Sequence, residues 1–297
     1  MTLSDQVLKN IITRLLNGED YRIEVLNLLN AQFLDYVIDF FKKVVDAKFE
    51  NEKITLDWYK KVFLSPDLRP EDVAIHAGLN KKTISNMHNS ARREIVLDAA
   101  INHYDTLRKL VDTLVEHDDE FDVTLSIKFR DVSVKLSINE CLIVINSLAV
   151  KRSALRGGLW STAGKRVEKP LMRTLCELYS VPATHYRQPD KKAYREVDFY
   201  LVGQDKEEYK CEVKLMGKGN PESADMVIAR GSHVFVADKL SDLNKDQLDG
   251  LDVHWVELRQ NEGYKRFQLV LEQLNIPHTV PKEDLSIALP RILDNVL

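Results

Sequence analysis

The fold is decided by the stretch REVDFYLVGQDKEEYKCEVKLM, residues 195–216. Apolar and polar side chains alternate on both sides of a polar turn centred on Asp205, which is typical of a β-hairpin. In the register that this turn sets, Asp198 lies opposite Glu212. Side chains alternate between the two faces of a strand, so one face is predicted to be core and the other chemical. The core face holds Val197, Phe199, Leu201, Tyr209, Cys211 and Val213. The chemical face holds Asp198, Tyr200, Lys210, Glu212 and Lys214.

The chemical face carries two carboxylates and a lysine in reach of one another. Facing carboxylates repel unless a cation lies between them, and a hard divalent ion such as Mg²⁺ takes oxygen ligands, so Asp198 and Glu212 are predicted metal ligands. Lys214 adds a cation that orients a water molecule or stabilises charge developing on a phosphate. The trio predicts Mg²⁺-dependent hydrolysis of a phosphodiester. The competing interpretation is a buried structural ion-pair cluster.

This spacing resembles the pattern of the PD-(D/E)xK nuclease superfamily: Asp198, thirteen residues, then Glu212-Val213-Lys214. The resemblance covers about residues 161–258 and implies a restriction-endonuclease-like α/β core with a central mixed sheet. It also implies an acidic residue on the first core helix, and Glu168 is predicted as this fourth site residue and third metal ligand. The alternative for Glu168 is a carboxylate at a helix N-terminus, facing the positive end of the helix dipole.

The chain departs from the superfamily pattern at Val197, where the pattern has proline. A Pro189-Asp190 pair occurs upstream, in the polar stretch RQPDKK. No strand pairing would bring Asp190 beside Glu212, whereas apolar strand residues surround Asp198. Asp198 is therefore preferred, and Asp190 is the alternative first ligand.

The rest of the chain divides into a helical part and a mixed part. Apolar residues recur every three or four positions in the first third, which predicts helices, and a β-hairpin follows from residue 121 to 136. A helix over 138–155 is expected to be broken by Gly157-Gly158. Further helices are predicted over 163–179 and 220–230, and strands over 195–202, 208–215, 232–237 and 253–258. The expected domains are helical, residues 1–118, and catalytic, residues 119–297, giving an α+β or α/β protein.

Residues 70–89 contain PEDVAIHAGLNKKTISNM, which resembles the helix-turn-helix of DNA-binding repressors. Ala74, Gly78, Leu79, Ile84 and Met87 fall where that motif needs a small residue, a turn glycine and apolar packing residues. Lys81 and Lys82 on the second helix are then candidate DNA contacts. Ordinary packing of two helices is the alternative.

Basic residues gather between 151 and 173, although the net charge of the chain is −4. Seven basic residues face one acidic residue in this stretch, which favours binding to a polyanion such as DNA. The predicted DNA contacts there are Lys151, Arg152, Arg156, Lys165, Arg166, Lys169 and Arg173. A solvated face of mixed charge is the alternative.

Composition indicates a globular protein of the cytoplasm. The chain has 297 residues, 44% of them hydrophobic, and no run as long as the ~18 apolar residues of a membrane span. Its three cysteines are scattered without a CxxC pair, which indicates reduced, buried thiols. No phosphate-binding loop of the GxxxxGK[ST] type occurs, so no nucleotide cofactor is expected.

Together these features resemble an ATP-independent type II restriction endonuclease, and the stretch AVKRSALRGGLWSTAGKRVEKPLM (149–172) is similar to the CfrBI-like group. The resemblance implies cleavage of double-stranded DNA at a specific site by a homodimer, because a two-fold symmetric protein reads a palindromic site. The alternatives are a helix-turn-helix regulator without catalysis and a structure-selective repair or junction nuclease. The recognition sequence and the cut position do not follow from spacing.

Overall fold

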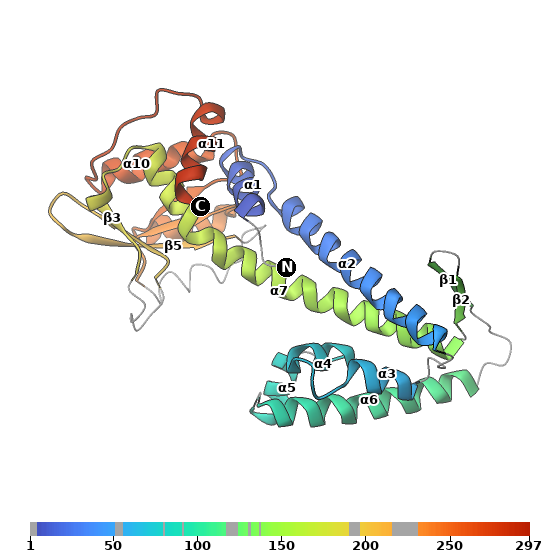
Figure 1. The fold of residues 1–297 in the computed structure, drawn as a ribbon. Helices are drawn as coiled ribbons and strands as arrows, with labels where there is room; N and C mark the ends of the chain where they lie inside the picture. Colours follow the sequence, from blue (N-terminus) through green and yellow to red (C-terminus); the bar gives the residue numbers. More distant parts are fainter. Residues whose placement is uncertain are drawn as a thin grey trace. The chain divides into compact units, whose positions relative to one another are not determined.

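The computed structural model describes residues 5–50, 56–79, 81–90, 92–116, 124–129, 132–136, 138–189, 197–215 and 231–297. The chain forms two compact units, one of Met1–Leu28 with Leu159–Leu297 and the other of Leu29–Gly158. Figure 1 shows two long helices, α2 (Arg22–Phe49) and α7 (Ile138–Leu178). Each of them has residues in both units.

A mixed sheet organises the first unit, which we call the sheet unit. Its strand order is β3-β4-β5-β6-β7, with β3/β4 and β4/β5 antiparallel and β5/β6 and β6/β7 parallel. The strands are β3 (Tyr186–Arg187), β4 (Phe199–Val202), β5 (Glu208–Lys214), β6 (Val234–Ala237) and β7 (His254–Glu257). The predicted hairpin register is confirmed, since Phe199 pairs with Cys211 and Val202 with Glu208. Strand β3 was not predicted, because two residues are too few to show a period.

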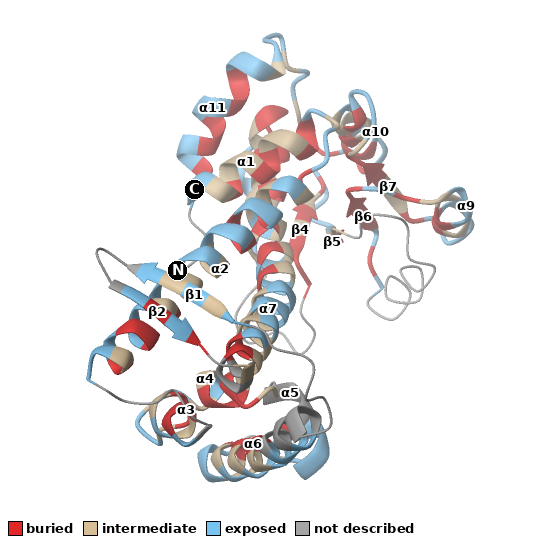
Figure 2. Ribbon diagram, turned by 90° about the vertical axis from the view of Figure 1, so that its right-hand side faces the viewer, coloured by how far each residue is buried: buried red, intermediate tan, exposed pale blue. Residues whose placement is uncertain are grey.

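Buried residues gather in the strands of this sheet (Figure 2), and they include the predicted core face of the hairpin. Five of the six predicted core residues are at most 5% exposed: Val197, Phe199, Leu201, Cys211 and Val213. Tyr209, near the turn, is half-buried. All four residues of β6 are fully buried, as expected for a parallel strand between two neighbours.

Helices and short turns complete the sheet unit. They are α1 (Asp5–Leu16), α9 (Asp242–Gly250), α10 (Arg266–Gln273), α11 (Leu285–Val296) and the 3₁₀ turns Ala183–His185 and Gly263–Lys265. Helix α9 begins at a capping box, in which Ser241 and Asn244 satisfy each other's backbone N–H groups. The helix predicted over 220–230 lies outside the described residues.

The second unit, which we call the helical unit, contains α3 (Leu56–Phe63), α4 (Pro70–His76), α5 (Lys81–His88), α6 (Arg93–Glu116) and the hairpin of β1 (Leu125–Phe129) and β2 (Val132–Leu136). The predicted hairpin is confirmed for its described residues, with Leu125 paired to Leu136. Both strands pack on the helical core through Leu125, Ile127, Val134 and Leu136.

The boundaries between the two units lie after Leu28 and after Gly158, not after residue 118 as expected. The packing of α1 and of the β1–β2 hairpin explains both differences. Helix α1 buries one face within the sheet unit, and its residues Ile11, Ile12 and Leu15 are fully buried. The β1–β2 hairpin contributes instead to the core of the helical unit.

The predicted break at Gly157-Gly158 is wrong, because helix α7 continues from Ile138 to Leu178. A glycine inside a helix costs about 1 kcal/mol relative to alanine, which is too little to end a helix whose next turns are buried. Leu159, Ala163 and Val167 follow at intervals of four residues and are at most 8% exposed.

The predicted helix-turn-helix segment folds as α4, a turn and α5. Gly78 takes the left-handed conformation, with φ +84°, and the N–H of Leu79 closes the end of α4 on the carbonyl of Ala74. Ala74 and Ile84 are fully buried with Val96 of α6. Met87 is 68% exposed, so its predicted packing role is wrong.

His76, at the end of α4, is a buried histidine of the helical unit. Its Nδ1 lies 3.1 Å from the Tyr36 hydroxyl, and its ring contacts Phe63 at 4.9 Å between centroids. Burial, and then the charge of Lys151, lower its pKa from 6.5 to about 4, against the opposing charge of Asp72.

This shift predicts a stability that depends on pH. Between pH 4 and 6.5 the unfolded chain binds a proton at His76 that the folded chain does not bind, so stability falls as the pH drops through this window, by up to ~3 kcal/mol. We expect the urea midpoint of His76→Phe to lose this part of the pH dependence. If the urea midpoints of the wild type and of the variant changed equally with pH, His76 would not be the source of this pH dependence.

All three cysteines, Cys141, Cys176 and Cys211, are buried free thiols, as predicted. Among the described residues, none of the helices combines the length and the apolar character needed to span a bilayer.

Candidate active site

The predicted hairpin brings its two carboxylates to the carboxyl end of β5. Asp198 directly precedes β4, and its Oδ2 accepts a hydrogen bond of 2.9 Å from the backbone N–H of Val213, the neighbour of Glu212. Asp198 is 8% exposed and Glu212 is fully buried. Two acidic side chains that the sequence places fourteen positions apart are therefore enclosed at one end of the sheet.

Lys214 lies on the same face of β5 as Glu212. Its Nζ is 3.1 Å from Oε1 of Glu212, and its side chain is 25% exposed. The lysine thus touches a buried carboxylate and keeps contact with solvent at the end of the strand. The ammonium group of Lys214 can therefore contact both the buried carboxylate of Glu212 and a molecule that binds from the solvent side.

Glu168 reaches the same site from α7. Its side chain shares a hydrogen bond with Asp198. Burial, followed by the charge of Asp198, raises the pKa of Glu168 to about 7; Lys214 lowers it and Glu212 raises it further. The alternative of a carboxylate at a helix N-terminus is wrong, because α7 begins at Ile138 and Glu168 lies in its interior.

The charges of this site do not balance as a simple ion pair would. Among the residues that the structure describes, three carboxyl groups, of Glu168, Asp198 and Glu212, lie near the ammonium group of Lys214. The raised pKa of Glu168 is the expected response of a carboxyl group that must ionise beside others in a partly buried place. Such a cluster attracts a proton or a further cation.

Carboxylate oxygens are the ligands that Mg²⁺ prefers, so the donor chemistry of these three side chains fits that ion. In the described part of the chain, however, no three His, Cys, Asp or Glu side chains are grouped as a ready ligand set. The alternative ligand Asp190 lies outside the described residues.

Four predicted DNA contacts lie on the part of α7 in the sheet unit. Lys165 and Lys169 are exposed on either side of Glu168 in the sequence. Arg166 is 3.6 Å from Asp5, and Arg173 is 3.6 Å from Glu177 and also donates to the carbonyl of Val296. The two lysines are therefore better placed for phosphates than the two arginines, which already have partners within the unit.

The other predicted DNA contacts belong to the helical unit. Lys151 is partly buried, with Nζ 3.9 Å from Asp72 and 4.8 Å from the Tyr36 ring centroid. Arg152 contacts Asn30 and the Phe33 ring, and Arg156 is exposed. Lys81 and Lys82 begin α5, and their side chains are outside the described part of the structure.

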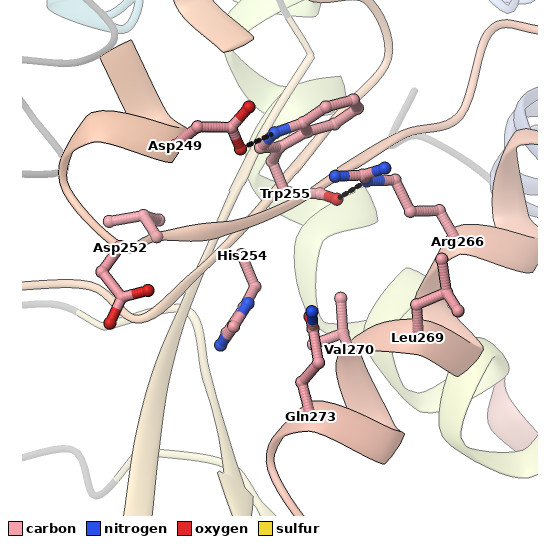
Figure 3. A pocket seen from close by; sticks show the side chains of 9 residues that line it. Asp249, Asp252, His254, Trp255, Arg266, Leu269, Val270 and Gln273 are labelled. Atoms are coloured by element: carbon pink, nitrogen blue, oxygen red, sulfur yellow. Dashed lines mark hydrogen bonds between the residues drawn. The ribbon is translucent and has the colours of Figure 1, made fainter. Parts of the chain in front are cut away.

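A hollow of about 260 Å³ lies beside β7, between α9 and α10, and none of the predicted site residues lines it (Figure 3). Trp255 lines it, with its Nε1 donating to Asp249 and the Arg266 guanidinium 3.4 Å from a ring centroid. Arg266 also donates to the carbonyl of Trp255. These side chains interact with one another, so we interpret the hollow as a space left where the helices pack against the edge of the sheet.

A mixed sheet with carboxyl groups and a lysine gathered at one end is the arrangement that the sequence predicts for a phosphodiester-cleaving nuclease. Comparison with protein families points to the same class. The family model described as "CfrBI restriction endonuclease" matches residues 5–245, most of the chain. The chain belongs to the CfrBI restriction endonuclease family.

The match also confirms the similarity seen in residues 149–172, which lie inside the matched range. It supports a nuclease that cleaves DNA at specific sites. No curated protein and no solved structure matches the chain.

Proposed function

We propose that this protein is a Mg²⁺-dependent endonuclease that hydrolyses phosphodiester bonds of double-stranded DNA at a specific site, with a core of the PD-(D/E)xK type. The observation that carries the proposal is the meeting of Glu168, Asp198 and Glu212 with Lys214 at one end of the sheet. Family membership favours a restriction enzyme over a regulator without catalysis or a repair nuclease.

Asp198 and Glu212, with Glu168, would hold the metal ion through their carboxylate oxygens. When bound, Mg²⁺ polarises a phosphate oxygen and lowers the pKa of a water molecule. The mutual repulsion of these carboxyl groups, which raises the pKa of Glu168, supports this assignment, because a divalent cation offsets it. Glu168 would then release the proton that its hydrogen bond with Asp198 requires.

Lys214 would act on the attacking water molecule or on the phosphate. Its ammonium group is fixed against Glu212 at 3.1 Å and stays partly exposed, so it can donate hydrogen bonds to a substrate at the strand end. A cation in this place stabilises the negative charge that develops on the phosphate oxygens.

The DNA backbone would be bound by Lys165 and Lys169 near the site, with Arg156 and the α4–α5 segment as further contacts. The exposed polar side chains of α5, such as Asn86, suit contacts to phosphates or base edges.

We propose a homodimer, because two copies related by a two-fold axis cut both strands of a palindromic site.

The proposal is tested by incubating the purified protein with unmethylated phage and plasmid DNA in Mg²⁺ or in EDTA. We expect discrete fragments in Mg²⁺ and intact DNA in EDTA, and the mapped fragment ends give the recognition sequence. Intact DNA in both lanes, together with a gel shift that persists in EDTA, would instead indicate a regulator. A smear or cleavage only at junctions would indicate a structure-selective nuclease.

The double variant Lys165→Ala, Lys169→Ala tests the phosphate contacts. We expect weaker DNA binding and a slope of log K against log salt that is reduced by about 2, because each phosphate contact contributes roughly 0.9. Lys206→Ala, Lys282→Ala is the matched control, since both lysines are exposed elsewhere in the sheet unit. An unchanged slope in the first variant would remove these lysines from the interface.

A further inference from the structure

Asp238 is a buried acid beside the candidate active site that neither the sequence pattern nor the proposed reaction uses. It directly follows β6 and its side chain is fully buried. Strands β5 and β6 are parallel and Lys214 pairs with Ala237, so Asp238 lies at the same end of the sheet as Lys214. The backbone N–H of Asp238 donates to the carbonyl of Lys214 at 3.3 Å.

Arg259 links Asp238 to the next strand. It follows β7, and its backbone N–H donates to the carbonyl of Asp238 at 2.7 Å. Its Nη1 lies 3.5 Å from Oδ2 of Asp238, and the arginine side chain is 15% exposed. The ends of three neighbouring strands are therefore tied together: β5 to β6 by a backbone contact, and β6 to β7 by backbone and side-chain contacts.

The chain of contacts ends at the turn between α1 and α2. Nη1 of Arg259 is 3.8 Å from Oδ1 of Asp20, which also accepts hydrogen bonds from Arg22. Gly18 permits this approach: its φ is +76°, and a Cβ atom there would lie 2.5 Å from the carbonyl oxygen of Gln260. The turn and the segment after β7 are thus in close backbone contact.

A buried ion pair is a weak source of stability, because the loss of hydration offsets most of the attraction between the charges. Its more specific effect is geometric, since both partners restrict the backbone that carries them. Here that backbone includes the carbonyl of Lys214, whose Nζ must stay at Glu212. A displacement of about 1 Å at a reacting group lowers a rate by up to about 100-fold.

We propose that Asp238 and Arg259 are positioning residues for Lys214: they hold the end of β5 in register with β6 and β7 so that the ammonium group stays on Glu212. The inference rests on the proposed function of Lys214. Asp20 supports Arg259 from the α1–α2 turn.

The test is single-turnover cleavage of DNA in Mg²⁺ together with the Kd of the same DNA in EDTA. Asp238→Asn is expected to slow cleavage 10- to 100-fold, with Kd changed less than threefold. Arg259→Lys keeps the charge but loses the guanidinium geometry, and it is expected to slow cleavage by about 3- to 10-fold.

Glu257→Gln is the matched control. Glu257 is also a buried acid at a strand end, 4% exposed and paired with Lys245 at 2.7 Å, but its partners are Lys245 and the N–H of Leu240 rather than β5. Its cleavage rate is expected to stay within twofold of the wild type, although the protein is less stable to urea.

Each result has one meaning. Cleavage by Asp238→Asn at the wild-type rate, or an equal slowing in Glu257→Gln, would overturn the inference. Should Asp238→Asn not fold, Arg259→Lys decides, and a wild-type rate in that variant overturns the inference. Absence of cleavage by the wild-type protein would reject the proposed function itself, which is a separate outcome.

Discussion

Replacing Lys214 by alanine is expected to lower the rate of DNA cleavage by about 10²- to 10³-fold or more, while DNA binding changes little. The ammonium group of Lys214 lies 3.1 Å from the buried carboxylate of Glu212, and the lysine side chain remains 25% exposed to solvent. Loss of one preorganised donor to developing charge costs about this much in other hydrolases. Single-turnover cleavage measures the rate, and a gel shift in EDTA measures the binding.

Lys210→Ala is the matched control for Lys214→Ala. Lys210 lies on the same face of β5, four residues before Lys214, and its partner on the neighbouring strand β4 is Tyr200. Its variant should cleave at close to the wild-type rate. An active Lys214→Ala protein would show that cleavage does not need this lysine. Equal losses in the two variants would show that the charge of the strand face matters and the position of Lys214 does not.

Local patterns were sufficient to predict the hairpin and its two carboxylates. Alternation fixes which side chains share a face, and the short polar turn fixes the register, so the pairing of Phe199 with Cys211 follows from residues 195–216 alone. The buried face of Val197 to Val213 follows from the same alternation. Helix α4 follows likewise from Pro70 at its start and Gly78 after its end.

Long-range packing could not be read in this way. The glycine pair in α7 is a local signal for a break, but burial of Leu159 and the residues that follow it maintains the helix. Helix α1 is joined to the sheet unit by contacts with residues more than 200 positions away, such as Lys9 with Asp294 at 2.5 Å. Asp238 is marked in the sequence only as an acid directly after the apolar run Val234–Ala237.

The interpretation of the site as an ion-pair cluster makes a prediction that differs from the nuclease interpretation. A structural pair loses about 3–5 kcal/mol when one buried partner is neutralised, because the other charge is left behind. A site built to hold a cation contains carboxylates that repel one another when the cation is removed, so loss of one of them relieves strain. The two interpretations therefore predict opposite changes in stability in EDTA.

Glu212→Gln separates them, and we expect it to lower cleavage in Mg²⁺ by at least about 10³-fold without lowering the stability of the protein in EDTA. Glu212 is fully buried near Asp198 and Glu168, and Lys214 can turn to solvent when its partner is neutral. Urea denaturation in EDTA gives the stability, and single-turnover cleavage gives the rate.

Glu257→Gln is the matched control in the same unit, and we expect it to lose stability but not activity. Its carboxylate is a structural partner, because Lys245 pairs with it and the backbone N–H of Leu240 donates to it. The variant should lose about 1–3 kcal/mol of stability and keep its activity. A Glu212→Gln protein that is destabilised as strongly as Glu257→Gln, yet still cleaves DNA, would mean that Glu212 is part of the scaffold. A stable, inactive protein would mean that Glu212 is maintained for the reaction at a cost to the fold.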